Sequence, residues 1–334
     1  MRALYSVFSS TALLIIHIHP NYKIYTICYF KTLTYLSNLR LRQHEEIKGT
    51  TVDIPSSVIS AKWLSQHIDH PSITVLDASW FMPGSERFPQ QEWAAKRIPG
   101  SLFFDFDNKI KSHESQLPHM LPTAEDFAHE VSKLGISNDS TLIVYDSVGL
   151  FSSPRVWWMF KAMGHNNVAV LDGGLPAWIA AGGAIATQAP ATEISVTTYI
   201  AKLQTRWIAS ADDVNQQLTN EAVTVVDARP AERFAGKQVE PRQGVRSGHM
   251  PNAKNLPFPK VVFDGKLADS ERLNKSFDEL APIQQRYIFT CGSGITACIL
   301  ALAAEQTGRE NIAVYDGSWT EWGSNEEYPV VKDE

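Results

Sequence analysis

The chain has 334 residues, of which 44% are hydrophobic and 20% are charged, as in an ordinary globular protein. This length exceeds what one hydrophobic core usually covers, so we expect two domains. The net charge of −6 gives no reason to expect nucleic acid as a partner. The three cysteines exclude a disulfide framework by number, and none has metal-ligand spacing with a histidine. We therefore expect a reducing compartment and no bound metal.

Residues 1–50 differ in composition from the rest of the chain. No Asp or Glu precedes Glu45, and the longest clean apolar run, Ala12 to Ile16, is far too short to span a bilayer. An organellar presequence, a weak signal peptide and a non-functional extension all fit this composition. We favour an extension outside the fold, a fold that begins near Val58, and a cytoplasmic protein without membrane contact. A presequence would instead indicate a mitochondrial one.

From there the sequence repeats itself. The repeated pairs are ITVLDA at 73–78 and VTVVDA at 223–228, RIPGS at 97–101 and HMPNA at 249–253, LIVYD at 142–146 and YIFTC at 287–291, and LDGGLPAW at 171–178 and YDGSWTEW at 315–322. Each copy alternates short buried strands with helical segments, which is typical of a parallel sheet covered by helices. The sequence thus predicts an α/β protein built from two tandem copies of one domain.

The two copies are expected at residues 58–186 and 206–332, joined by a connector at 187–205 that lacks clear periodicity. They differ chemically, because Asp146 in the first copy stands at the position of Cys291 in the second. A carboxylate cannot act as a sulfur nucleophile. We therefore expect the first domain to be catalytically silent and mainly structural, with a small ligand enclosed between the domains.

The most informative stretch is RYIFTCGSGITAC at residues 286–298. Its YIFT run predicts a buried strand, and the apolar residues after Thr296 predict a buried helix. Between them, Cys291 is followed by Gly292 and Gly294, which free the backbone for a tight loop. Several N–H groups and the positive end of a helix would then face one sulfur atom, and such surroundings stabilise a nucleophilic thiolate. The alternative is a buried structural cysteine before an ordinary turn.

A cluster of arginines is the second candidate feature. A planar guanidinium binds a carboxylate through two parallel hydrogen bonds, and two of them can clamp an α-keto acid. The alternative is surface ion pairing with Glu232 and Glu240, which contributes little. We favour anion binding by the cluster, which comprises Arg229, Arg233, Arg242 and Arg246 within 18 residues.

These features together resemble the rhodanese superfamily. The resemblance covers roughly Val58 to Val331 and rests on the duplication, the Asp-Ala-Arg and His-x-Pro-x-Ala segments, the CGSGITA loop, and the strings LPHMLP, SPRVWWM and YDGSWTEWG. Within the superfamily, the loop resembles that of 3-mercaptopyruvate sulfurtransferases. Thiosulfate sulfurtransferases of this fold typically carry cationic residues where Gly292 and Ser293 stand here.

The resemblance implies a function and a set of residues. The sulfur of 3-mercaptopyruvate would pass to a small thiol, a reduced dithiol protein or cyanide through a persulfide, with release of pyruvate and without metal or organic cofactor. Cys291 would carry the sulfur, and Arg233 and Arg242 would hold the substrate carboxylate. The loop that cradles the sulfur would comprise Gly292, Ser293, Gly294, Ile295 and Thr296.

One departure and three alternatives accompany this interpretation. Family members often have His before Ile-Pro-Gly in the first domain, where a hydroxyl–imidazole–carboxylate relay has been proposed. Here Arg97 stands there, so proton delivery must come from elsewhere or from water. The alternatives are a thiosulfate:cyanide sulfurtransferase, a non-catalytic sulfur-binding module, and a phosphatase, which would need an arginine where Ala297 and Cys298 stand. Cys298 is expected to be a buried helix residue rather than a resolving thiol.

Overall fold

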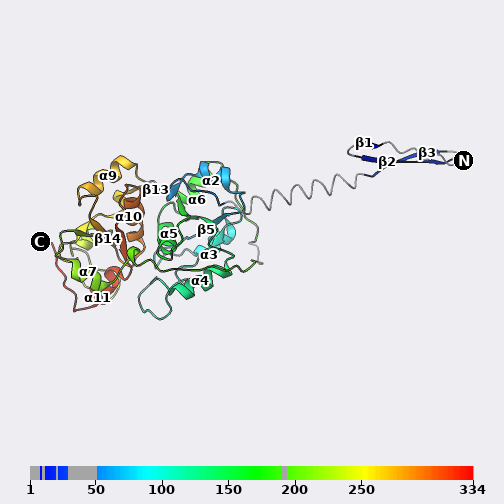
Figure 1. Ribbon diagram of the computed structural model, residues 1–334. Coiled ribbons are helices and arrows are strands. Elements are labelled where there is room, and N and C mark those ends of the chain that lie inside the picture. The colour runs from blue at the N-terminus through cyan, green and yellow to red at the C-terminus, as the bar shows by residue number, and fades with distance from the viewer. Residues whose placement is uncertain (1–7, 10–11, 20–21, 29–50, 190–193, 334) are drawn as a thin grey trace. The chain divides into compact units, whose positions relative to one another are not determined.

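The computed structural model describes residues 8–9, 12–19, 22–28, 51–189 and 194–333 (Figure 1). The chain divides into two compact units, Met1–Thr51 and Val52–Glu334. In the first unit, three strands form an antiparallel sheet in the order β1-β2-β3. They are β1 (Phe8–Ser9), β2 (Ala12–His19) and β3 (Tyr22–Cys28). Among the described residues, no helix is long and apolar enough to cross a membrane.

The second unit begins with a five-stranded parallel sheet in the order β4-β8-β7-β5-β6. Helices alternate with its strands along the chain, as the sequence predicts. The elements are β4 (Val58–Ile59), α2 (Ala61–His67), β5 (Ile73–Asp77), α3 (Pro89–Ala95), β6 (Leu102–Phe103), α4 (Ala124–Lys133), β7 (Thr141–Tyr145), α5 (Ser153–Ala162), β8 (Val168–Leu171) and α6 (Gly174–Ala180).

The second half repeats this topology, with a parallel sheet in the order β9-β15-β14-β10-β11. It adds one antiparallel hairpin, β12–β13. The elements are η1 (Thr205–Trp207), β9 (Ile208–Ala209), α7 (Ala211–Gln217), β10 (Val223–Asp227), α8 (Ala231–Phe234), β11 (Lys254–Asn255), η2 (Phe258–Lys260), β12 (Val262–Phe263), β13 (Lys266–Leu267), α9 (Ser270–Asp278), β14 (Arg286–Thr290), α10 (Thr296–Glu305), β15 (Ile312–Tyr315) and α11 (Ser318–Ser324). The predicted α/β fold with two tandem domains is confirmed.

Local sequence explains why the elements begin where they do. Ser60 and Ser210 cap equivalent helices, α2 and α7, by accepting a backbone N–H three residues on. Thr123 and Asp269 cap α4 and α9 in the same way. The central strands β7 and β14 carry apolar, β-branched and aromatic side chains that are almost entirely buried. Repeated capping and strand patterns therefore produce two similar domains.

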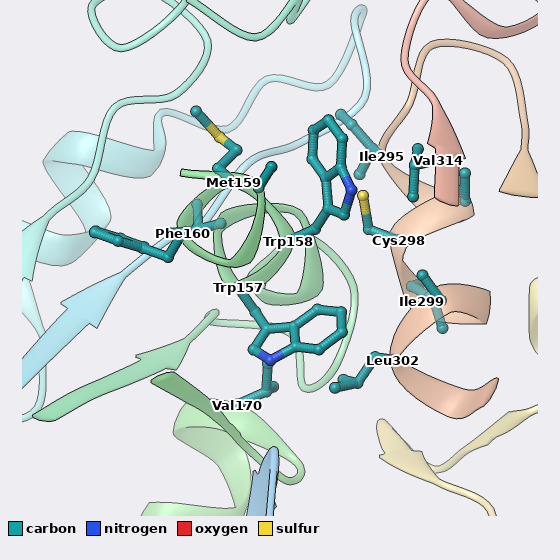
Figure 2. Packing of buried hydrophobic residues seen from close by; sticks show 14 of the residues in the cluster. Trp157, Trp158, Met159, Phe160, Val170, Ile295, Cys298, Ile299, Leu302 and Val314 are labelled. Carbon is teal, nitrogen blue, oxygen red and sulfur yellow. The ribbon is translucent and has the colours of Figure 1, made fainter. Parts of the chain in front are cut away.

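A shared core joins the two domains. Helices α5 and α10 lie side by side, and both are buried along nearly their whole length (Figure 1). Figure 2 shows Trp157 and Trp158 of α5 facing Leu302 and Cys298 of α10. Burying each large apolar side chain contributes about 1.5–3 kcal/mol, so this contact fixes how the domains meet.

Two reciprocal hydrogen bonds also cross between the domains. The N–H of Leu121, just before α4, donates to Oδ2 of Asp316 at 2.7 Å. The N–H of Leu267, just before α9, donates to Oδ1 of Asp172 at 2.9 Å. Asp172 and Asp316 follow the equivalent strands β8 and β15. Each domain thus extends a segment over the carboxyl end of the other domain's sheet.

Candidate active site

Cys291 follows the central strand β14 and precedes α10, as the sequence predicts. Cys291 belongs to the buried cluster that contains residues of both domains, and only 1% of it is exposed. The loop is held from outside through its carbonyl groups: the N–H of Trp319 donates to the carbonyl of Cys291 at 2.9 Å, and Thr320 donates both its N–H and its hydroxyl to the carbonyl of Gly292. The Cys291 N–H donates to the hydroxyl of Ser318.

The remaining backbone N–H groups of the loop are open, which here means that they have no hydrogen-bond acceptor. Within residues 51–189 and 194–333, no acceptor is found for the backbone N–H groups of Gly292, Ser293, Gly294, Ile295 and Thr296. The loop also ends at the start of α10, where backbone N–H groups have no partner inside the helix. This concentration of donors favours an anion beside Cys291.

Arg233 and Arg242 approach the same loop. A Cβ atom built on Gly292 would lie 3.5 Å from Nη2 of Arg233 and 4.0 Å from Nη1 of Arg242. Arg233 also forms an ion pair with Glu240, while no ion pair of Arg242 occurs in the described part of the chain. The structure therefore brings two guanidinium groups to the residue next to Cys291. That of Arg233 already donates through Nε and Nη2 to Glu240, whereas that of Arg242 remains able to bind a carboxylate through two nitrogens.

The other two arginines of the cluster have structural partners. Buried Arg229 contacts Asp227 and Glu240, each at 2.7 Å, and its guanidinium lies over the Trp319 ring. Arg246 donates to four backbone carbonyls at and after the end of α11. Arg233 and Arg242 therefore remain as the candidate anion-binding residues.

The first domain contributes residues that sequence reasoning missed. Nδ1 of His119 lies 2.8 Å from Oδ1 of Asp107. Arg155, at the start of α5, donates through Nη1 to the carbonyl of Gly294 at 3.2 Å and to Oδ1 of Asp316 at 2.5 Å, and through Nη2 to the carbonyl of His119. The strings LPHMLP and SPRVWWM contain these two residues, so the signal was present without an assigned role.

Burial sets the protonation of this first-domain pair. Burial lowers the pKa of His119, and the nearby guanidinium groups of Arg155 and Arg242 lower it further, while Asp107 opposes both. The hydrogen bond with His119 lowers the pKa of Asp107. A neutral imidazole therefore faces a carboxylate at neutral pH, close enough to Arg242 to respond to its charge.

Arg97 is not part of the loop, whereas Cys298 contacts it from the first turn of α10. Arg97 is buried, donates to the carbonyl of Ala94, and makes no contact with the Cys291 loop among the described residues. From the sequence we expect proton delivery from elsewhere because Arg97 replaces histidine, and His119 is a candidate for it.

Cys298 is confirmed as a buried helix residue: its thiol donates to the carbonyl of Gly294 at 3.2 Å, and burial raises its pKa. In the described ranges no group of His, Cys, Asp and Glu could hold a metal ion.

Comparison with known proteins agrees with this geometry. The rhodanese-like domain family matches residues 60–181 and 210–325. The chain is 40% identical to the mitochondrial thiosulfate/3-mercaptopyruvate sulfurtransferase 1 of Arabidopsis thaliana, over 84% of this chain and 79% of the relative. It is 38% identical to the 3-mercaptopyruvate sulfurtransferase of Escherichia coli K12, over 81% of this chain and 96% of the relative.

A solved structure shows the same fold. The crystal structure of the 3-mercaptopyruvate sulfotransferase SseA from Escherichia coli superposes with a TM-score of 0.72 at 36% identity, covering 79% of this chain and 99% of that one. The chain belongs to the rhodanese family, and it is a sulfurtransferase. An enzyme of this class needs a sulfur donor and a thiol acceptor.

Proposed function

We propose that this chain transfers the sulfur of 3-mercaptopyruvate to a thiol or to cyanide through a persulfide on Cys291, releasing pyruvate. The observation that carries the proposal is the approach of Arg233 and Arg242 to Gly292, beside a loop whose N–H groups are open. Two cations suit the carboxylate and keto oxygen of an α-keto acid, and the open donors suit an anionic sulfur. The names of the Arabidopsis and Escherichia coli relatives support the same donor.

The reaction follows from these positions. With the carboxylate of 3-mercaptopyruvate on Arg233 and Arg242, the Cys291 thiolate attacks the donor sulfur. A sulfur–sulfur bond forms, the carbon–sulfur bond breaks, and its electron pair moves into the enolate of pyruvate. Protonation of the enolate carbon gives pyruvate, and the donor's thiol proton goes to the persulfide or to a base. The loop N–H groups stabilise the sulfur anion, and the His119–Asp107 pair, which Arg155 links to the loop, is the candidate for the proton transfers.

The first domain carries no sulfur in this scheme. Asp146 occupies the position of Cys291, and its carboxylate is enclosed by backbone donors. The β12–β13 hairpin of the second domain lies over this loop: a Cβ on Gly149 would lie 2.7 Å from the Cα of Gly265. The first domain instead supports the active site of the second through Arg155 and His119.

Thiosulfate is the second candidate donor, because the name of the Arabidopsis relative includes it. Thiosulfate is a compact dianion, and its sulfite leaving group needs cations close to the attacked sulfur. The loop from Cys291 to Thr296 contains no charged residue. We therefore expect kcat/KM to be higher for 3-mercaptopyruvate by at least about a hundredfold, which is ~2.7 kcal/mol of transition-state stabilisation.

Steady-state kinetics with both donors, combined with intact mass spectrometry, test the proposal. Wild type incubated with 3-mercaptopyruvate should gain about 32 Da, one sulfur atom, and Cys291→Ser should not. Arg233→Ala and Arg242→Ala should raise KM for 3-mercaptopyruvate and remove most of the donor preference. A sulfur adduct that persists in Cys291→Ser would disprove the assignment of the nucleophile. Equal use of both donors by wild type would disprove the donor preference.

The proposed acceptor is a small thiol or a reduced dithiol protein, and the proposed location is the cytoplasm. Mitochondrial import is the alternative if residues 1–50 act as a presequence. This alternative is tested because the name of the Arabidopsis relative includes the word mitochondrial. Full-length protein and protein lacking residues 1–50, each with a fluorescent protein at the carboxyl end, should both remain in the cytoplasm. Mitochondrial fluorescence from the full-length protein alone would overturn this assignment.

A further inference from the structure

One arginine of the first domain reaches the catalytic loop of the second. Arg155 is the third residue of α5, and its side chain is fully buried. Its guanidinium lies over the Trp158 ring, with 4.6 Å from Cζ to the ring centroid. From there Nη1 donates to the carbonyl of Gly294 and to Asp316, and Nη2 donates to the carbonyl of His119. One rigid planar group therefore joins three segments that are distant in sequence.

The contact with Gly294 fixes the orientation of a loop peptide. In a trans peptide the C=O and the following N–H point in opposite directions. Because Arg155 holds the Gly294 carbonyl, the N–H of Ile295 points away from Arg155, toward the opposite side of the loop. Trp319 and Thr320 hold the carbonyls of Cys291 and Gly292 in the same manner. The direction of the open N–H groups thus depends on donors outside the loop.

Gly294 leaves little freedom for this peptide to move. Its φ is +79°, and a Cβ there would lie 2.8 Å from Oδ1 of Asp316 and 2.9 Å from Nη1 of Arg155. Glycine is required both by the left-handed backbone and by the close approach of these groups. The loop is therefore packed directly against the Arg155–Asp316 ion pair.

Arg155 also holds the backbone of His119, in the first domain. His119 has a φ of +63°, in a left-handed region that is strained for a residue with a side chain. Two hydrogen bonds hold this backbone conformation. The guanidinium of Arg155 donates to the His119 carbonyl, and Asp316 accepts the N–H of Leu121 two residues later. Arg155 and Asp316 together hold the segment that places the imidazole against Asp107.

We propose that Arg155 is a positioning residue for sulfur transfer, which aligns the loop N–H groups and the His119–Asp107 pair with Cys291 from the first domain. The proposal rests on Cys291 as the sulfur carrier. The proposed donor-binding residues are Arg233 and Arg242, while the guanidinium of Arg155 is occupied by protein acceptors. Loss of its alignment therefore affects the chemical step more than donor binding.

Arg155→Lys tests this role, since a single ammonium group cannot serve the three acceptors that the guanidinium fork reaches. Persulfide formation is followed by rapid quench and intact mass, and kcat and KM are measured with 3-mercaptopyruvate. We expect kcat to fall at least about thirtyfold while KM changes less than about threefold. A rise in KM with unchanged kcat would overturn the proposal.

Arg309→Lys is the matched control. Arg309 is also a buried arginine, paired with Asp278 and hydrogen-bonded to Tyr287 and Thr307, and among the described residues it makes no contact with the loop. Both lysine variants should lower the thermal unfolding midpoint, but only Arg155→Lys should lower kcat per folded molecule. Equal kcat in the two variants would show that Arg155 acts on stability alone.

Asp316→Asn is the second variant, because it removes the ion pair while keeping the side-chain shape. It should reproduce the fall in kcat at nearly constant KM. If neither Arg155→Lys nor Asp316→Asn folds, the pair is a folding requirement and the positioning role is rejected. Absence of a sulfur adduct on wild-type Cys291 would instead reject the proposed function, so the two failures are distinguishable.

Discussion

The Asp146 loop of the first domain and the Cys291 loop of the second follow equivalent central strands, yet their backbone N–H groups have different partners. The carboxylate of Asp146 accepts six hydrogen bonds of 2.8–3.1 Å. The donors are the N–H groups of Val148, Gly149, Phe151, Ser152 and Ser153 and the hydroxyl of Ser153. In the Cys291 loop, which reaches its helix two residues sooner, the N–H groups of residues 292–296 have no acceptor among the described residues.

This difference in hydrogen bonding indicates that the Cys291 loop favours an anionic ligand. The first loop contains its own anion, and its donors are satisfied in the folded protein. The second loop lacks that anion, and each unsatisfied buried N–H costs about 1–3 kcal/mol. An anionic persulfide on Cys291 would satisfy several of these donors at once. In the proposed function, the first domain therefore displays, with a carboxylate, the arrangement that the second domain would reach with sulfur.

The strongest test converts the second loop into a copy of the first. Cys291→Asp should abolish sulfur transfer, by more than about ten-thousandfold or ~5.5 kcal/mol in barrier, because no sulfur nucleophile remains. It should also unfold at a higher temperature than Cys291→Ser, since a carboxylate can accept the open N–H groups. Calorimetry of the two variants measures this. A lower midpoint for the aspartate variant would mean that the loops are not equivalent anion cradles.

Removing the charge of the Asp146 carboxylate tests the first loop, and its main effect should be on stability. Asp146→Asn places an amide NH₂ against backbone donors, so we expect the free energy of unfolding to fall by about 3 kcal/mol. Activity per folded molecule should change by less than about twofold, because Asp146 is not a catalytic group. Denaturant unfolding and donor kinetics measure both quantities. Asp139→Asn, at an exposed position of the same domain, is the control and should change neither.

Asp77 and Asp227, which end equivalent strands of the two domains, extend the comparison to the pH dependence of stability. Asp227 pairs with Arg229, whereas Asp77 has Ser79 in the equivalent place. Burial raises the pKa of Asp77 to about 6. The folded state thus keeps the proton up to about pH 6 while the unfolded state releases it near pH 4, so the contribution of Asp77 to stability falls as pH rises from about 4 to 6.

Substitution by asparagine removes this pH dependence at position 77. At pH 7 Asp77→Asn should raise the free energy of unfolding by about 1–3 kcal/mol, and at pH 4 it should have little effect. Asp227→Asn should lower stability at pH 7, because it leaves buried Arg229 with one carboxylate fewer. Urea unfolding across this pH range compares the two. The same sign for both variants at pH 7 would contradict the assigned difference.

The smallest expected effect is at Arg97. Arg97 and His249 occupy equivalent positions, and each pairs through its backbone with a later segment of its own domain. Since Arg97 makes no described contact with the loop, Arg97→His should change kcat/KM by less than about tenfold, under ~1.4 kcal/mol. His119→Asn should lower it by more than that. A rescue of several orders of magnitude by Arg97→His would show that an imidazole is needed at position 97.

Local sequence predicted the parts of the site that are continuous in the chain. The strand, the Cys291 loop and the buried helix are encoded by neighbouring residues, and the repeat predicted the fold. The charge pattern alone could not separate Arg233 and Arg242 from Arg229 and Arg246. The family resemblance singled out the first two, and the structure gives the other two their structural partners. Sequence reasoning also missed Arg155 and His119, because Arg155 meets Gly294 and Asp316 across 139 and 161 residues and Leu121 meets Asp316 across 195.

The reciprocal bonds of Leu121 with Asp316 and of Leu267 with Asp172 have the pattern of an isologous interface, in which one patch contacts its own copy across a two-fold axis. The chain thus holds within one polypeptide the contact that a symmetric homodimer makes between two. A linked pair is free to lose its symmetry, and in the proposed function one half carries the nucleophile while the other supplies Arg155 and His119.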